Sequence, residues 1–530
     1  MRSRTTLTGG RGEDPDSVAA DRPEPPERPG DTPGIGARTV PEAEPVARDL
    51  GPVPRVAMEW ASRLYWLWPA LVTLAIVGVR PGQAEPWRDE LATWSAASRP
   101  LHEVLRLANH IDAVTSPYYL LMWCWIRITG DSALAMRLPS LVAIVVSCAV
   151  LTVLGRRLFG PRVGVSAGLL YAVLPITSRY AQEARGYGFA MLFAVTSTLL
   201  LVRALERPTF RRWAGYALAL YGLALANLLM LLLLLGHAVA VLTAPRVAGR
   251  RPLPGWLVSA VVVGIGVSPL LWLGRHQSAT QLDWVPPAKI EALPDLPGGV
   301  FGSAAVGGLI LGLAALGWAQ RGRWGGILGL AALGPVVVIF FAGQQQPVFV
   351  ARYLIFTVPL LTLLAAATMD RIRPAALLAI VSVVAFLGAN SQLGLRSTHE
   401  WPRSAPRAYS AAARIIDENE RPGDGIVYPD RGDWAFLDIA MAYHLGDRIP
   451  RDVLLRRSAQ QRGTLWASEC SDPAACLAGT DRIWLLGVGE RTDPMEEMPD
   501  RKAAALDDGY VLDRQWTVPG LTVRLLVRRG

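Results

Sequence analysis

Long apolar runs, separated by short loops, fill most of the middle of this 530-residue chain and limit what it can fold into. A helix needs about 20 residues to cross roughly 30 Å of hydrocarbon, so runs of this kind predict membrane-spanning helices. Composition agrees, because 51% of the residues are hydrophobic and only 18% are charged. We expect about eleven transmembrane helices, over residues 60–79, 138–154, 163–176, 188–205, 213–226, 228–243, 256–273, 300–319, 324–342, 354–369 and 375–391.

The arginines between the apolar runs predict how the chain is oriented. Every second loop is basic, and the positive-inside rule places such loops in the cytoplasm. These arginines are Arg156, Arg157 and Arg162, then Arg203, Arg207, Arg211 and Arg212, then Arg246, Arg250 and Arg251, then Arg321 and Arg323, then Arg371 and Arg373. The N-terminus is therefore expected in the cytoplasm and the C-terminal segment outside.

Residues 116–129 (SPYYLLMWCWIRIT) are apolar but short for a span. Tyrosine and tryptophan gather at membrane interfaces, so we expect this segment to form a helix along the outer surface. The segments that then face outside are 80–115, 177–187, 275–297 and 344–353, together with the chain from residue 393 onward.

The two ends of the chain differ from its middle. Residues 1–55 are rich in Pro, Gly and charged side chains, which predicts a disordered cytoplasmic tail. Residues 393–530 contain two strand patterns, GIVYPD and RIWLLGVG, and a helical pattern, SAAARIIDENE, which predict a small extracytoplasmic α/β domain. The fold class expected is a polytopic α-helical membrane module over 56–392 followed by this soluble domain. Cys470 and Cys476 could be bridged there or stay reduced.

Several function classes find no support. The net charge of +9 is spread over interhelical loops and forms no basic stripe, so nucleic acid is not expected as a partner. No HExxH pattern, Walker loop, dinucleotide-binding glycine pattern or Cys/His ligand array occurs in the sequence. Protease, ATPase and dehydrogenase activities are therefore not indicated.

Asp89 and Glu90 follow directly after the first predicted span, in the sequence EPWRDELATWSAAS. Acidic side chains at a membrane surface can simply be solvated, or they can belong to a site. Adjacent residues on a helix point about 100° apart, so these two carboxylates are not expected to share one role. We treat both as candidate catalytic residues, with Glu90 left to orient, hydrogen-bond or remain solvated.

Polar residues in the other outer segments are candidates for substrate binding. Arg352 and Tyr353 begin a span on the outer face, where an arginine opposes the charge bias and could bind a lipid phosphate or anchor the chain at the headgroups. His110 lies near Asp112 and could hydrogen-bond a phosphate or a sugar. The second outer loop combines Arg179, Glu183, Arg185 and Tyr187, either as part of a site or as an interfacial cluster.

The order of short motifs resembles one known group. An Asp-Glu pair after the first span, SPYY about 25 residues later, then RLPS and GRRLFG are similar to the GT-C membrane glycosyltransferases, nearest to family 39 and the RgtA/B/C/D-like bacterial group. This resemblance implies a GT-C fold in a bacterial cell membrane and a polyprenyl-phosphate sugar as donor. It also implies that Asp89 is the catalytic base, and that Glu183 helps to bind substrate or metal.

The chemistry of sugar transfer fits these residue types. A carboxylate must accept the proton of the acceptor hydroxyl, and cations must stabilise the departing phosphate. We expect an inverting transferase in which Asp89 is the base and Arg352, with Arg185 and His110, holds the phosphate. The acceptor is a glycan, lipid or protein on the outer face; a divalent metal at Asp89 and Glu183 stays open.

Two other functions agree less well with the sequence. A transporter or lipid flippase also needs many spans with buried polar groups, but the candidate residues crowd one membrane face and no paired broken spans are evident. A membrane anchor for the outer domain would need only one helix.

Overall fold

The computed structural model describes residues 64–246, 249, 251–282, 285–397, 407–432 and 434–530. The disordered tail predicted over residues 1–55 lies outside the described residues.

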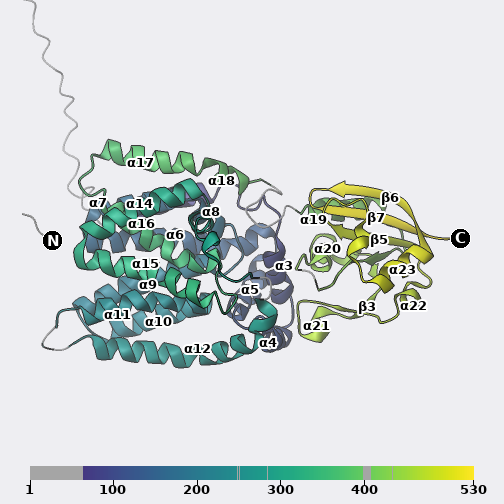
Figure 1. Ribbon diagram of the computed structural model, residues 1–530, viewed down its shortest axis with the longest axis horizontal. Helices are drawn as coiled ribbons and strands as arrows, with labels where there is room; N and C mark the ends of the chain where they lie inside the picture. Colours follow the sequence, from purple (N-terminus) through teal and green to yellow (C-terminus); the bar gives the residue numbers. More distant parts are fainter. Residues whose placement is uncertain (1–63, 247–248, 250, 283–284, 398–406, 433) are drawn as a thin grey trace, which may run out of the picture. The chain divides into compact units, whose positions relative to one another are not determined.

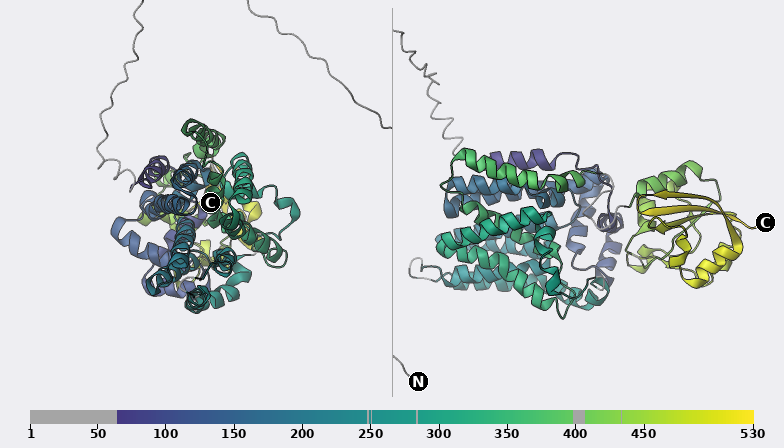
Figure 2. Two further views of the ribbon diagram at one scale, coloured as in Figure 1. Left: turned by 90° about the vertical axis from the view of Figure 1, so that its left-hand side faces the viewer. Right: turned by 45° about the horizontal axis from the view of Figure 1, so that its top comes forward.

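The apolar runs form helices, as the sequence predicts. Most of the long helices run side by side in Figure 1 and are seen end-on in the left view of Figure 2. The helices formed by the predicted apolar runs are α2 (Leu67–Val77), α6 (Ala133–Phe159), α7 (Pro161–Val173), α9 (Tyr187–Glu206), α10 (Phe210–Ala226), α11 (Leu234–Leu242), α12 (Leu253–Gln281), α14 (Ala304–Gln320), α15 (Gly322–Ala342), α16 (Val358–Ala367) and α17 (Pro374–Leu387).

Not every predicted span is one long α-helix. Among the described residues, four helices are long and apolar enough to cross a membrane: α6, α9, α12 over Leu253–Ser278, and α15. The runs predicted at 228–243 and 354–369 begin with the 3₁₀ helices η1 (Leu228–Leu233) and η3 (Ala351–Thr357), which shortens their α-helical parts. The polytopic helical class is confirmed, while the count of eleven spans stays a prediction.

Glycines let some helices of the bundle approach closely. A Cβ on Gly164 of α7 would lie 2.4 Å from the carbonyl oxygen of Thr152 on α6. Small residues are common where membrane helices pack, because they bring two backbones into contact. The pairing of α6 with α7 is thus fixed by backbone contact.

Short elements lie between the long helices. They are α3 (Arg88–Ala97), α4 (Leu101–His110), α5 (Ser116–Thr129), α8 (Pro175–Ala181), η2 (Ile290–Ala292), α13 (Leu296–Phe301) and α18 (Ala389–Gly394). Helix α5 covers the segment predicted to lie along the outer surface, and it packs against α3, α4 and α6 with Tyr118, Tyr119 and Met122 buried. Its depth in the membrane stays a prediction.

The C-terminal part contains the predicted sheet. Its elements are α19 (Tyr409–Asn419), β1 (Gly425–Val427), α20 (Leu437–Leu445), η4 (Gly446–Arg448), β2 (Arg451–Asp452), β3 (Leu455–Arg457), α21 (Ala459–Arg462), β4 (Ser468–Glu469), α22 (Pro473–Leu477), β5 (Arg482–Val488), η5 (Pro494–Glu497), α23 (Asp500–Gly509), β6 (Tyr510–Val518) and β7 (Leu521–Arg528). In the described residues, the larger sheet has the order β2-β1-β5-β7-β6. Strand β1 is parallel to β2 and β5, whereas β7 is antiparallel to β5 and β6.

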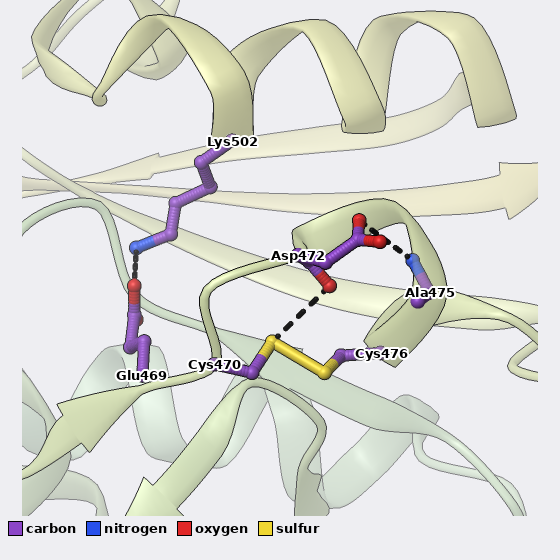
Figure 3. The surroundings of a disulfide bond; sticks show 6 residues. All are labelled: Glu469, Cys470, Asp472, Ala475, Cys476 and Lys502. Carbon is purple, nitrogen blue, oxygen red and sulfur yellow. Dashed lines mark hydrogen bonds and ion pairs between the residues drawn. A yellow bond between two sulfur atoms is a disulfide. The ribbon is translucent and has the colours of Figure 1, made fainter.

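The predicted patterns match this domain. GIVYPD contains β1, RIWLLGVG contains β5, and SAAARIIDENE lies within α19 and the residue that ends it. Figure 3 shows that Cys470 and Cys476, whose state the sequence left open, form a disulfide. The neighbouring Glu469 forms an ion pair with Lys502 of α23, at 2.6 Å. The soluble α/β part of the predicted fold class is therefore present.

Candidate active site

Helix α3 places the two candidate carboxylates in its first turn. Trp87 is extended, and its backbone N–H donates to the side chain of Glu90 at 3.4 Å, which is the half of a capping box that the third helical residue supplies. Acidic side chains in a first turn also interact favourably with the helix dipole. The helix therefore begins at Arg88, and the side chains of Asp89 and Glu90 leave it in different directions.

Glu90 is fully buried and does not line the cavity that Asp89 faces. Its carboxylate accepts hydrogen bonds from the guanidinium of Arg137 on α6, at 2.8 and 2.7 Å. The backbone N–H of Ala184, in the loop between α8 and α9, donates to the same carboxylate at 2.8 Å. The side chains of Glu90 and Arg137 are each 1% exposed. Glu90 thus joins α3, α6 and the loop between α8 and α9.

Asp89 faces a cavity instead. Arg352 donates from Nη1 to its Oδ2 at 3.2 Å, and Arg88 Nε lies 3.7 Å from its Oδ1. Arg352 is separated from Asp89 by 263 positions in the chain, so the fold brings the first turn of α3 to η3. A carboxylate and two guanidinium groups therefore meet at one point.

The candidate residues of the segment predicted to be the second outer loop lie in two different environments. Arg185 and Tyr187 line the cavity. Glu183 is 1% exposed and lies 3.6 Å from Arg179 Nε, and neither of these two residues lines the cavity. Glu183 lies in the turn after α8, while Tyr187 begins α9, so these two residues do not lie on one helix face. Arg185 is the charged residue of this loop that reaches the cavity.

Two arginines of the cavity, Arg352 and Arg185, stay charged despite their burial. Burial works against the charge of Arg352, but Tyr187 and the carboxylate of Asp89 outweigh it and raise its pKa above the ordinary value. Burial also works against the charge of Arg185, whose pKa is nevertheless raised by Tyr119 and Asp89. Two permanent positive charges beside one carboxylate make a site for an anion that can compete for the guanidinium groups.

The cavity has a volume of about 890 Å³ and two kinds of wall. Ligand pockets usually have volumes of roughly 300–1,000 Å³, so this one has room for a large ligand or for two. Its polar part includes Arg88, Asp89, Asp112, Thr115, Arg185 and Arg352. Its apolar part includes Leu228 and Leu229 of η1 and Leu271 of α12.

Asp112 is held in an unusual conformation at the polar wall. It has φ +63°, which non-glycine residues seldom adopt. Thr115 donates to its carboxylate at 2.7 Å, and the phenol of Tyr119 donates to its other oxygen. Backbone strain of this kind is concentrated at functional sites. We therefore add Asp112 to the candidate site.

His110 and the suggested metal pair lie outside this arrangement. His110 is exposed at the end of α4, beside Gly463, and does not line the cavity. Asp89 and Glu183 are each next to an arginine. Within the described residues, no group of three or more His, Cys, Asp and Glu side chains could hold a metal ion. The geometry gives no support to a metal at Asp89 and Glu183.

The cavity also contains residues that were not predicted, and only some of them could have been found from the sequence. Arg88 adjoins the acidic pair and Asp112 precedes the SPYY motif, so position alone could have indicated them. Trp434, Phe436 and Leu465 of the C-terminal domain also line the cavity. They lie more than 300 positions from Asp89 in the chain, and no local pattern links them to it.

Part of the chain is similar in sequence to a known protein family. Residues 117–272 match the family model described as dolichyl-phosphate-mannose-protein mannosyltransferase. No curated protein sequence matches the chain.

Solved structures are similar over most of the chain. ArnT from Cupriavidus metallidurans in the apo state has a TM-score of 0.56 at 14% identity, covering 89% of this chain and 98% of ArnT. The same protein bound to undecaprenyl phosphate gives 0.55 at 14% identity, covering 88% and 98%. The arabinofuranosyltransferase AftD from Mycobacteria gives 0.50 at 17% identity, covering 89% of this chain and 40% of AftD.

These identities are low, so the structural likeness speaks for the fold, and the family match speaks for residues 117–272. Both agree with the resemblance that the sequence motifs indicate. The chain therefore has the GT-C fold of membrane glycosyltransferases and is similar to the mannosyltransferase-like members of that class.

Proposed function

We propose that this chain is an inverting membrane glycosyltransferase, which moves a sugar from a polyprenyl-phosphate donor to a hydroxyl group on the outer face of the membrane. The observation that carries this proposal is the meeting of Asp89, Arg352 and Arg185 in one cavity. The family match and the similarity to ArnT, whose structure was solved with undecaprenyl phosphate, support the same donor class.

The donor phosphate would sit among the arginines. Guanidinium groups bind phosphate oxygens through two parallel hydrogen bonds, and Arg352 and Arg185 offer such groups at the cavity wall. A phosphate entering here would compete with Asp89 for Arg352. Leu228, Leu229 and Leu271 would contact the polyprenyl chain, because they form the apolar wall of the same cavity.

Asp89 would act as the base. The carboxylate takes the proton of the acceptor hydroxyl as that oxygen attacks the anomeric carbon. The bond between the anomeric carbon and the phosphate oxygen breaks, and its electron pair leaves with the polyprenyl phosphate. The arginines stabilise the negative charge that develops on this leaving group. Attack opposite the leaving group inverts the anomeric centre.

Radiolabelled sugars test this proposal. Membranes containing the protein would be incubated with a panel of polyprenyl-phosphate sugars, and label would be followed into lipid, glycan and protein fractions. We expect transfer from at least one donor, absent from membranes without the protein. If every donor is only moved across the bilayer, with no label reaching an acceptor, the chain is a flippase and the proposal is wrong.

A further inference from the structure

The C-terminal domain forms an aromatic part of the cavity wall. The rings of Trp434 and Phe436 lie 5.9 Å apart at 76°, and both residues line the cavity. Trp466 packs against them, with its ring 4.9 Å from Trp434 and 5.9 Å from Phe436. We call Trp434, Phe436 and Leu465 the aromatic wall. None of its members belongs to the membrane module.

The aromatic wall is held firmly in place. Phe436 has φ +49°, a conformation that is strained for a bulky residue and that surrounding contacts must maintain. The hydroxyl of Tyr409 donates to the carbonyl of Ala435 at 2.8 Å. Arg99, which is 2% exposed, donates to the carbonyl of Thr464 at 2.8 Å. Each loop of the wall is therefore held by a hydrogen bond, buried at Ala435 and partly buried at Thr464.

The aromatic wall stands on the side of the cavity formed by α3. Phe436 belongs to the same buried cluster as Leu91 and Ala92, which flank the first turn of α3 where Asp89 lies. The apolar wall assigned to the donor chain comes from η1 and α12, which belong to the membrane module. The aromatic wall is thus separate from the apolar wall assigned to the donor lipid, and it lines the same cavity as Asp89.

These surroundings match the chemistry of a carbohydrate. A sugar ring carries polarised C–H groups on its faces, which are attracted to the negative face of an aromatic ring, and hydroxyl groups at its edge. Asp112, Thr115 and Arg88 provide hydrogen-bonding groups in the same cavity.

We propose that the aromatic wall binds a carbohydrate acceptor. In this arrangement, Trp434 positions a sugar ring of the acceptor so that one of its hydroxyl groups points towards Asp89. This inference rests on the proposed function and narrows the acceptor to a glycan. Trp434 is then a specificity-determining residue, whereas the donor site does not depend on it.

The test measures acceptor and donor separately. The full chain in nanodiscs would be assayed for binding of a set of defined mannose, galactose and arabinose oligosaccharides, and then for transfer with increasing acceptor at fixed donor. We expect Trp434→Ala to weaken oligosaccharide binding, and to raise the half-saturating acceptor concentration, by about tenfold, with the donor value unchanged. Trp434→Phe, which keeps an aromatic ring, should retain most of the oligosaccharide binding of wild type.

A matched control lies in the same domain. Trp516 stacks on Trp484 at 5.7 Å and does not line the cavity, so Trp516→Ala should leave oligosaccharide binding unchanged. The inference is overturned if wild type binds none of the oligosaccharides, if Trp434→Ala binds them like wild type, or if Trp434→Ala changes only the donor value. Failure of the proposed function is a different result, in which oligosaccharides bind through Trp434 but no sugar is transferred.

Discussion

Removing the charge of Glu90 should destabilise the protein strongly. In Glu90→Gln, one carboxylate oxygen becomes an NH₂ group that can no longer accept a hydrogen bond. Whichever oxygen is lost, two donors lose their acceptor: Arg137 and Ala184 in one case, Arg137 and Trp87 in the other. The guanidinium of Arg137, 1% exposed, also loses its counter-charge. Removing one partner of a buried ion pair typically costs about 3–5 kcal/mol.

An exposed ion pair provides the matched control. Glu206 pairs with Arg157, and their side chains are 41% and 36% exposed, so Glu206→Gln should cost less than about 1 kcal/mol. Both variants would be unfolded with increasing SDS in mixed micelles and compared with wild type. If Glu90→Gln is as stable as Glu206→Gln, Glu90 does not hold the site together, and the reasoning fails. Turnover by Glu90→Gln should fall together with its stability, because α3 and the second outer loop lose their common contact.

Three further predictions concern binding, orientation and pH. Arg352→Ala should weaken binding of an undecaprenyl-phosphate probe at least tenfold, since a charged hydrogen bond contributes roughly 1.5–3 kcal/mol. The control variant Arg207→Ala, at an exposed position, should bind the probe like wild type. If both variants bind the probe equally well, Arg352 does not belong to the donor site. A phosphatase reporter fused after Ser391 should be active outside the cell and one after Arg157 silent; the reverse pattern would place the cavity in the cytoplasm. Burial lowers the pKa of His444 below its ordinary value of about 6.5, so the unfolded chain binds the proton more readily than the folded chain. The stability of the protein should therefore fall as the pH drops from about 7.5 to about 5. His444→Gln should lose less thermal stability over that range, and identical pH profiles would show that His444 does not contribute.

The sequence was sufficient for the fold class because the apolar helices and a few elements of the C-terminal domain have strong local patterns. Apolar runs of span length predict helices without knowledge of their neighbours, and the short continuous apolar run in RIWLLGVG predicts the buried strand β5. Residues such as those of η1 were predicted less well, since 3₁₀ and α-helical geometry share one apolar pattern. The number of helices that cross the membrane depends on their tilt and depth, which no local pattern contains.

The site was predictable only where its residues interrupt a pattern. Asp89 follows an apolar run and Arg352 opposes the charge bias, so both stand out in the sequence. The different environments of Asp89 and Glu90 follow from helix geometry, but the identity of Arg137 as the partner of Glu90 required the packing of α6 on α3. Trp434 reaches the cavity through tertiary contacts alone, and its sequence neighbourhood gives no sign of it.

Purified Asp89→Asn most directly tests the central claim that Asp89 is the catalytic base. Asparagine keeps the shape of the side chain and can still accept the hydrogen bond of Arg352, but it cannot take up a proton. Turnover should fall by about 10²–10⁴-fold, as is typical for loss of a general base, while binding of the polyprenyl-phosphate donor persists. Transfer by Asp89→Asn at the wild-type rate, measured with the same donor and acceptor, would contradict the mechanism.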